Sequence, residues 1–223
     1  MTFHDRTDAG KQLAEKLSTY RSRDDAIVLG LPRGGVPVAF AVAEELGLPV
    51  DTFVVRKVGV PGREELAMGA VASGEVVVKN DEVIEKLGIP DHVFDEVLRR
   101  EAEEVRRRED AYRGHRSPLP LDGRVAIIVD DGLATGATMR AAVRAVKQRG
   151  PQEIVAAAPV ATPETVAQLE QLADRVVTVH QPTALDGVGA WYDDFQQITN
   201  AEVTEVLEKA ATQFATNGAN MPL

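Results

Sequence analysis

Two adjacent carboxylates, Asp130 and Asp131, directly follow a run of apolar and mostly β-branched residues at positions 125–129. Such a run is typical of a strand that is covered on both faces of a parallel sheet. The aspartates then lie at the carboxyl edge of that sheet, where open α/β folds bind their ligands. We therefore take both side chains as candidates for ligand contact.

A short turn of small residues and hydroxyls follows the two aspartates. Its members are Ala134, Thr135, Gly136, Ala137 and Thr138. Small side chains let backbone N–H groups approach a ligand, and the helix expected from residue 137 onwards begins with amides that have no partner inside the helix. The turn and the positive end of the helix dipole together predict a phosphate site.

Residues 129–138 as a whole resemble the signature of the type I phosphoribosyltransferases. These enzymes bind 5-phosphoribosyl-1-pyrophosphate (PRPP) and replace its pyrophosphate with a nitrogenous acceptor. The resemblance implies that Asp130 and Asp131 are catalytic and hold the ribose hydroxyls, and that residues 134–138 hold the 5′-phosphate. Solvated aspartates, or a threonine that caps the next helix, explain either half of the motif but not both in this order.

A second strand, turn and helix pattern occurs near the start of the chain. Residues 26–31 are apolar, residues 32–35 form a turn, and residues 36–46 have helical composition. The glycine spacing does not fit the G-x-G-x-x-G dinucleotide fingerprint, which removes the main support for a nicotinamide site. The family resemblance implies that this turn cradles pyrophosphate through Arg33, Gly34 and Gly35.

Residues 50–58 are predicted to form a third strand with Arg56 and Lys57 at its end. Adjacent cations at the carboxyl edge can contact pyrophosphate, although a basic pair is more often solvated. We count Arg56 and Lys57 among the catalytic candidates. Glycine and proline in residues 59–65 predict a mobile segment, and the following residues to 79 predict a β-ribbon, which matches the loop that closes over PRPP in the resembled family.

Residues 81–116 are predicted to be a helical insertion. An apolar stripe runs along residues 91–112 at helical spacing and consists of Phe94, Leu98, Ala102, Val105 and Tyr112. Three consecutive arginines at 106–108 stand among acidic residues, which favours a solvated, salt-bridged face over nucleic-acid binding. Because the stripe needs an apolar partner, we expect the chain to form a homo-oligomer.

Five apolar strands that alternate with helices predict an α/β fold with a doubly wound, mainly parallel five-stranded sheet, a flexible-loop β-ribbon, a helical insertion and a small hood. We expect a single domain over residues 1–215. Its predicted parts are the core at 26–80 and 117–181, the insertion at 81–116, and the hood at 1–20 and 182–200, followed by a disordered tail at 216–223.

The acceptor base is predicted to contact Trp191 and Tyr192, which follow the last strand on a glycine-rich loop. The alternative is that both rings seal the sheet edge against the N-terminal helix. Family members that act on 6-oxopurines usually carry an Asp where this chain has Ala134, and a Lys in the next strand, which residues 153–161 lack. Hypoxanthine and guanine are therefore disfavoured, while adenine, orotate, uracil and xanthine stay open.

Composition narrows the function classes further. The formal net charge of −10 disfavours nucleic acid and anionic membranes as partners, and the chain has no cysteine. No signal peptide or membrane-spanning run is found in the sequence, so we expect a cytoplasmic protein.

The resemblance implies Mg²⁺ as cofactor, with Asp130 and Asp131 as metal contacts through water. A non-catalytic PRPP- or nucleotide-sensing protein of the same fold is the alternative function.

Overall fold

Continuous apolar runs form the centre of the molecule, because strands covered on both faces expose no polar side. The computed structural model describes residues 2–114 and 116–217, and within them it contains a sheet of five parallel strands in the order β2-β1-β6-β7-β8. The strands are β1 Ala26–Gly30, β2 Val50–Thr52, β6 Val125–Val129, β7 Glu153–Val160 and β8 Arg175–His180. The predicted fold class is confirmed.

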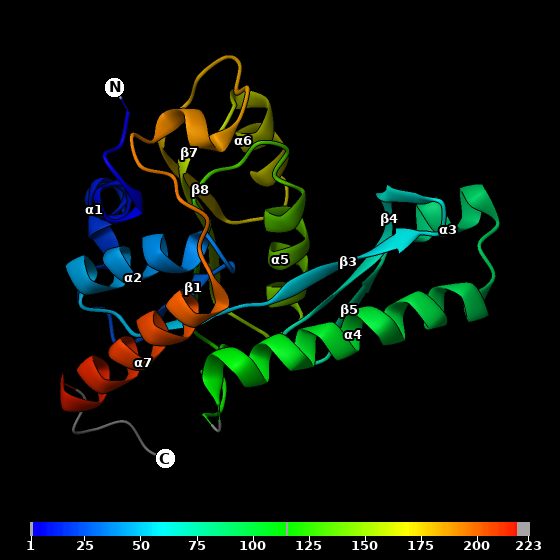
Figure 1. Ribbon diagram of the computed structural model, residues 1–223, viewed down its shortest axis with the longest axis horizontal. Helices are drawn as coiled ribbons and strands as arrows, with labels where there is room; N and C mark the ends of the chain where they lie inside the picture. Colours follow the sequence, from blue (N-terminus) through cyan, green and yellow to red (C-terminus); the bar gives the residue numbers. More distant parts are fainter. Residues whose placement is uncertain (1, 115, 218–223) are drawn as a thin grey trace.

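Helices cover both faces of the sheet (Figure 1). One face packs on α1 Arg6–Lys16 and α2 Gly35–Leu46, and the other on α5 Ala137–Lys147 and α6 Pro163–Leu169. The helix predicted in the N-terminal hood is thus α1, followed by a 3-10 turn at Ser18–Tyr20. Asp5 caps the start of α1 through a hydrogen bond from the amide of Asp8.

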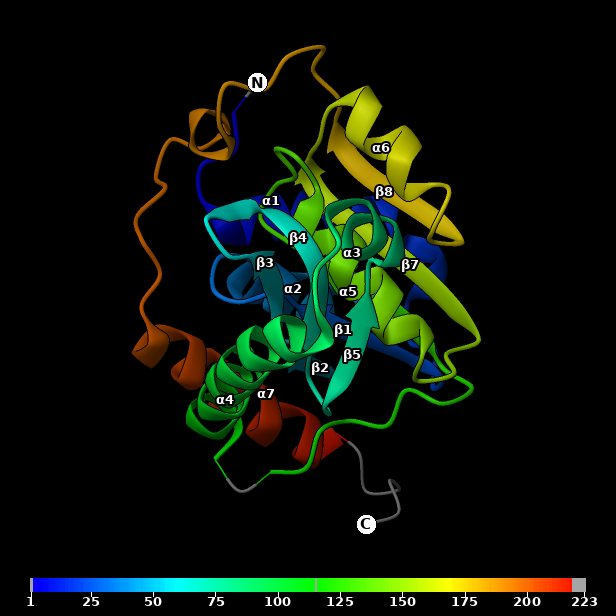
Figure 2. The same cartoon turned by 90° about the vertical axis from the view of Figure 1, so that its right-hand side faces the viewer.

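An arm extends from the sheet and consists of a second, antiparallel sheet with two helices (Figures 1 and 2). Its elements are β3 Val55–Val60, β4 Arg63–Ala72, β5 Val76–Lys79, α3 Asp81–Leu87 and α4 Asp91–Arg113. Helix α4 runs along the strands, and α3 lies at the distal end. The predicted ribbon and the predicted insertion helix are both present, and together they form this arm.

The prediction of one strand over residues 50–58 is wrong. Strand β2 ends at Thr52, and at Val54 the chain pairs instead with Ser73, whose amide donates to the Val54 carbonyl at 2.9 Å and whose hydroxyl accepts from the Val54 amide at 2.8 Å. The chain therefore leaves the main sheet and enters the arm. Residues 59–65, predicted to be mobile, form the tip of the β3–β4 hairpin, with Gly62 at φ 75° in its turn; their mobility stays a prediction.

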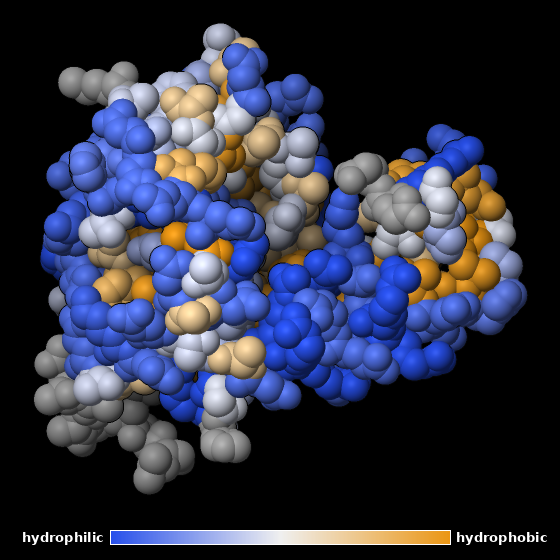
Figure 3. Space-filling model, viewed as in Figure 1, coloured by the Kyte–Doolittle hydropathy of each residue, from blue (hydrophilic) through white to orange (hydrophobic). Residues whose placement is uncertain are grey.

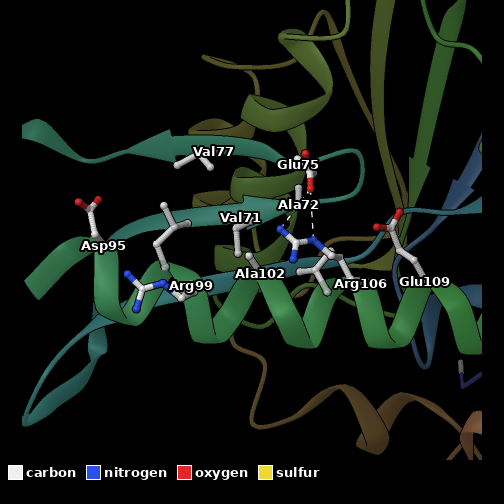
Figure 4. A pocket seen from close by; sticks show the side chains of 11 residues that line it. Val71, Ala72, Glu75, Val77, Asp95, Arg99, Ala102, Arg106 and Glu109 are labelled. Carbon is white, nitrogen blue, oxygen red and sulfur yellow. Dashed lines mark hydrogen bonds and ion pairs between the residues drawn. The ribbon is translucent and has the colours of Figure 1, made fainter. Parts of the chain in front are cut away.

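The apolar stripe of α4 is covered mainly by the chain itself. Phe94, Val105 and Tyr112 are buried in a cluster with the arm sheet and with α7 Asn200–Asn217. Leu98 and Ala102 are partly buried and line a groove of about 410 Å³ between α4 and the strands β4 and β5. Figure 4 shows this groove, with the ion pair of Arg106 and Glu75 beside it. Self-association stays a prediction, but the stripe no longer requires it.

Helix α7 ends the described part of the chain. Residues 216 and 217, assigned to a disordered tail from the sequence, belong to α7, and the remainder of that predicted tail lies outside the described residues. No helix within the described part of the chain is long and apolar enough to cross a membrane.

Candidate active site

Two of the predicted ligand-binding turns lie side by side, because β1 and β6 are neighbouring parallel strands. Gly30 is in register with Val129, and the amide of Leu31 donates to the Val129 carbonyl at 2.9 Å. The residues that follow these strands, 31–35 and 130–131, therefore leave the same edge of the sheet. The prediction that this edge holds both turns is correct.

Gly34 and Gly35 are required by the close approach of these two turns. A Cβ atom on Gly34 would lie 1.9 Å from Oδ2 of Asp131, and one on Gly35 would lie 2.6 Å from the Val129 carbonyl oxygen. Real Cβ atoms do not come this close to other atoms. The paired glycines thus place the backbone of residues 33–35 directly against the two aspartates. Arg33 is half-buried beside them.

The turn at residues 134–138, which is predicted to bind phosphate and is called the phosphate turn below, is held by contacts from α5 and α6. Gly136 has φ 65° and precedes the first residue of α5, and a Cβ atom there would lie 2.6 Å from Cγ2 of Thr165. The Thr165 hydroxyl donates to the carbonyl of Ala134 at 3.3 Å, and Arg140 donates to the carbonyl of Thr135 at 2.6 Å. The Thr135 hydroxyl accepts a hydrogen bond from the amide of Ala137 at 3.4 Å, and the side chains of Thr135 and Thr138 are exposed.

The two carboxylates lie in different environments. Oδ1 of Asp130 accepts a hydrogen bond from the amide of Asp131 at 2.9 Å, and Oδ2 of Asp131 accepts from Nε of Arg6 at 2.9 Å. Burial raises the pKa of Asp130 well above its usual value, and the neighbouring Asp131 charge raises it further. Burial also raises the pKa of Asp131, but the Arg6 guanidinium opposes that shift.

Arg6 is a site residue that the sequence did not single out. Its side chain is only 10% exposed, and it donates to Asp131 and, through Nη1, to the carbonyl of Gln196 at 2.9 Å. Its guanidinium lies 3.9 Å from the ring centre of Phe195, a cation–π contact. Arg6 lies three residues before Ala9 and seven before Leu13, so it falls on the apolar face of α1. A charged residue on that face was the sequence signal that could have identified Arg6. From the sequence, both aspartates are expected to face solvent before ligand binding; the burial of both carboxylates and the Arg6 ion pair of Asp131 show that this expectation is wrong.

Trp191 and Tyr192, which are predicted to bind the acceptor base, have different surroundings. Tyr192 is 7% exposed, packs against Phe3, and donates its hydroxyl to the carbonyl of Asp131. Burial raises its pKa above the usual tyrosine value. Trp191 ends the 3-10 turn η2 Val188–Trp191, remains partly exposed, and packs its ring 5.4 Å from that of His180. Tyr192 thus supports the acidic turn, and of the two only Trp191 keeps a substantial exposed surface.

Arg56 and Lys57 lie in strand β3 of the arm, away from the sheet edge. Nη2 of Arg56 forms an ion pair with Glu101 of α4 at 2.7 Å, so Arg56 is engaged within the arm. Lys57 is exposed and lines a cleft of about 560 Å³ together with Thr138 of the phosphate turn. The arm therefore brings Lys57 to the start of α5, although from a different sheet than predicted.

Comparison with known proteins identifies the family. A model of the phosphoribosyl transferase domain matches residues 3–190. This chain belongs to the phosphoribosyl transferase domain family. A Mycobacterium tuberculosis (strain ATCC 25618 / H37Rv) protein, provisionally named a phosphoribosyl transferase, is 43% identical over 217 residues, which are 97% of this chain and 49% of that protein. The chain thus spans about half the length of the curated relatives it matches.

A solved structure has a closely similar fold. The crystal structure of TT1426 from Thermus thermophilus has a TM-score of 0.85 to this chain at 41% sequence identity, and the match covers 94% of this chain and 99% of that one. A shorter stretch of 59 residues is 44% identical to the uracil phosphoribosyltransferase of Nocardioides sp., over 26% of this chain and 28% of that enzyme. The phosphoribosyltransferase resemblance of the central motif is confirmed.

The acidic pair of this phosphoribosyltransferase domain suits a hydrated Mg²⁺ ion. Oδ2 of Asp130 and Oδ1 of Asp131 have no hydrogen-bond partner among the described residues. Mg²⁺ prefers oxygen ligands, keeps several waters, and is commonly held by one or two carboxylates together with substrate phosphates. Within the described ranges no group of three or more metal-ligating side chains occurs, so phosphate oxygens would have to complete the coordination shell.

Arg6→Ala is expected to weaken PRPP binding by about 1–3 kcal/mol, the scale of a hydrogen bond to a charged group. Without the guanidinium, the repulsion between the two aspartates is less compensated, and the pKa of Asp131 should rise further. The loss should therefore grow as the pH is lowered from 8 to 6. Calorimetric titration with PRPP measures it, and Lys11→Ala, an exposed change on the same helix, serves as the control. An equal effect in both variants would exclude a specific role for Arg6.

Proposed function

We propose that this chain transfers the 5-phosphoribosyl group of PRPP to a nitrogenous base and releases pyrophosphate, with Mg²⁺ as cofactor. One observation carries the proposal. At one edge of the main sheet, a glycine turn packs against a pair of carboxylates, and each carboxylate has one oxygen without a hydrogen-bond partner among the described residues. The phosphate turn, with its exposed hydroxyls, leaves the same edge. These are the parts that a phosphorylated sugar with a pyrophosphate leaving group requires.

Each turn has a distinct task in this proposal. The amides of residues 134–138 bind the 5′-phosphate at the start of α5, and the open oxygens of Asp130 and Asp131 accept hydrogen bonds from the ribose hydroxyls. The backbone of residues 33–35 holds the pyrophosphate. Lys57 approaches from the arm and stabilises the negative charge that develops as pyrophosphate leaves. Bound Mg²⁺ neutralises part of that charge.

Arg56 has a smaller part than Lys57 in this scheme. Its ion pair with the buried Glu101 orients strand β3 on α4 and so positions the neighbouring Lys57. The hairpin tip at residues 59–65 follows Arg56 and Lys57 along the chain and joins β3 to β4. Movement of this hairpin towards the phosphate turn would exclude water from the reacting carbon.

The acceptor base is proposed to stack on Trp191, the partly exposed ring of the hood. Trp191→Ala is then expected to weaken base binding by about 1–3 kcal/mol, the scale of base–aromatic stacking, and to leave PRPP affinity unchanged. Titration of the PRPP-loaded protein with the active base measures the change. A lower melting temperature with unchanged base affinity would assign Trp191 to packing against His180 alone.

The experiment that tests the function is pyrophosphate release from PRPP with Mg²⁺ across adenine, orotate, uracil, xanthine, hypoxanthine and guanine. Release that depends on one base supports the transferase and names its acceptor; we expect hypoxanthine and guanine to be inactive. PRPP binding without release for any base supports the alternative, a PRPP-sensing protein. A protein that does not bind PRPP fits neither function.

A further inference from the structure

A second cavity lies between the arm and helix α5, on the face of the arm sheet that is turned away from α4. It measures about 540 Å³, the size of pockets that hold small-molecule ligands. Its floor is made of small and apolar residues of β4 and β5, and its inner end reaches Thr135 and Ala137 of the phosphate turn. Figure 3 shows the molecular surface hollowed between the body and the arm.

Among the described residues that line this cavity, every charged side chain is cationic. They are Lys57, Lys79, Arg140 and Arg144. Asn80 and Thr135 add polar groups, and the lining residues that the structure describes include no carboxylate. This is unusual in a chain whose formal net charge is −10. A cavity of one sign in an acidic protein concentrates anions locally.

Arg140 is placed unfavourably unless an anion is present, whereas Arg144 lies in the last turn of α5, where the helix dipole favours a cation. Arg140 and Arg144 stand four residues apart on α5, where like charges repel, and Arg140 lies at the end of the first turn, near the positive end of the helix dipole. No acidic residue occurs in that first turn. Arg140 donates to Thr135 and Gln168, whereas Arg144 is exposed and forms no ion pair or hydrogen bond with any described residue.

We propose that this cavity is a second anion site, which binds a chain of phosphoryl groups, either inorganic polyphosphate or the triphosphate of a nucleotide. Such a ligand lies along the exposed side of α5 and contacts Arg144 and Arg140. Lys57 lines both this cavity and the cleft beside Thr138, so it stands between this ligand and the pyrophosphate of PRPP. Lys79 also lines the cavity, but its ammonium group lies 4.7 Å from the ring centre of Phe94 in α4, so we assign it no direct contact with the ligand. Since the ligand bridges α5 and the arm, its binding restrains the arm.

The test uses the full chain and calorimetric titration with inorganic tripolyphosphate, ATP and AMP, with and without saturating PRPP. Tripolyphosphate and ATP should bind one per chain in the presence of PRPP, and AMP should bind much more weakly. Arg144→Gln should weaken tripolyphosphate binding about tenfold, the effect of losing one charge-assisted hydrogen bond. Lys147→Gln, the same charge change on an exposed residue one turn further along α5, should leave it unchanged.

Several results would overturn the second site. Complete displacement of tripolyphosphate by PRPP would place the anion in the PRPP site. Equal losses of tripolyphosphate affinity in the Arg144 and Lys147 variants would indicate non-specific charge attraction. If AMP bound as tightly as ATP, the phosphoryl chain would not be the recognised group. Absence of tripolyphosphate binding would also contradict it. Arg144→Gln should keep PRPP affinity, so failure of PRPP to bind any variant would count against the proposed function and not against this site.

Discussion

Asp130→Asn is expected to weaken PRPP binding by about 1.5–3 kcal/mol while it raises the stability of the fold at neutral pH. The affinity falls because the carboxylate no longer supplies a charge-assisted hydrogen bond to a ribose hydroxyl. The stability rises because the native protein holds a buried charge beside a second one, which is why the pKa of Asp130 is raised. An amide of the same shape removes both costs.

The pH dependence of that stability gain has a definite sign. Between the ordinary aspartate pKa and the raised pKa of Asp130, the folded state binds more protons than the unfolded state, so stability falls as the pH rises through this window. The Asn variant lacks this loss. Thermal unfolding should therefore show the variant to be more stable at pH 7.5, with a difference that shrinks towards pH 4.

The control for this experiment is Asp122→Asn, the same change at an exposed loop position. It should alter neither PRPP affinity nor the pH dependence of stability. An Asp130 variant that binds PRPP as tightly as the native chain would contradict the assignment of the acidic pair, and a less stable variant at pH 7.5 would contradict the cost of its burial.

Asp131 is not interchangeable with Asp130 in such a test. Its carboxylate is the ion-pair partner of Arg6, whose side chain is only 10% exposed, so Asp131→Asn leaves a buried guanidinium without its counter-charge. Loss of one partner from a buried pair is costly. From the sequence alone, Asp131→Asn would be expected to weaken PRPP binding without unfolding the protein. The buried ion pair leads us to expect a loss of both stability and affinity instead, so Asp130 is the better probe of ligand contact.

Arg113→Ala is expected to destabilise the protein by about 3–5 kcal/mol, the cost of breaking a buried ion pair. Arg113 is 7% exposed, and its Nε donates to both oxygens of Asp51 at 2.9 and 3.1 Å. Its Nη1 also donates to Glu109 at 2.6 Å. Without the guanidinium, the buried Asp51 charge in the middle of β2 has no cationic partner, and the end of α4 loses the hydrogen bonds of Arg113 to the main sheet.

Chemical denaturation measures this effect, and Arg107→Ala on the same helix is the control. Arg107 pairs with Glu104 on an exposed face, and hydrogen bonds from Arg107 and Arg108 lower the pKa of Glu104 to about 2. Exposed pairs contribute little, so this variant should lose less than about 1 kcal/mol. Asp51→Leu combined with Arg113→Met should recover part of the lost stability, because the buried Asp51 charge is removed together with its partner. Equal losses for Arg107→Ala and Arg113→Ala would contradict the anchoring role.

The sequence by itself determined the main sheet and the position of the two turns that are predicted to bind ligand. Unbroken apolar runs such as residues 125–129 can be satisfied only between two layers of helices, and the small residues after them leave room for backbone amides. Parallel strands then bring the following turns to one edge without further information. For this reason Gly34, Gly35, Asp130 and Asp131 were placed correctly relative to one another.

Tertiary structure alone decided which side chains serve those turns. The chain leaves the main sheet at Val54 because Val54 pairs with Ser73. The local patterns of both segments predict only strand, so Arg56 and Lys57 were assigned to the wrong sheet. The pairing of Arg6 with Asp131 joins residues 125 positions apart, and no local periodicity encodes it. Burial of the Tyr192 hydroxyl against the acidic turn likewise follows from packing of the hood. Long-range contacts thus set the charge balance of the site, because burial and neighbouring charges, not residue type, determine the state of each carboxylate.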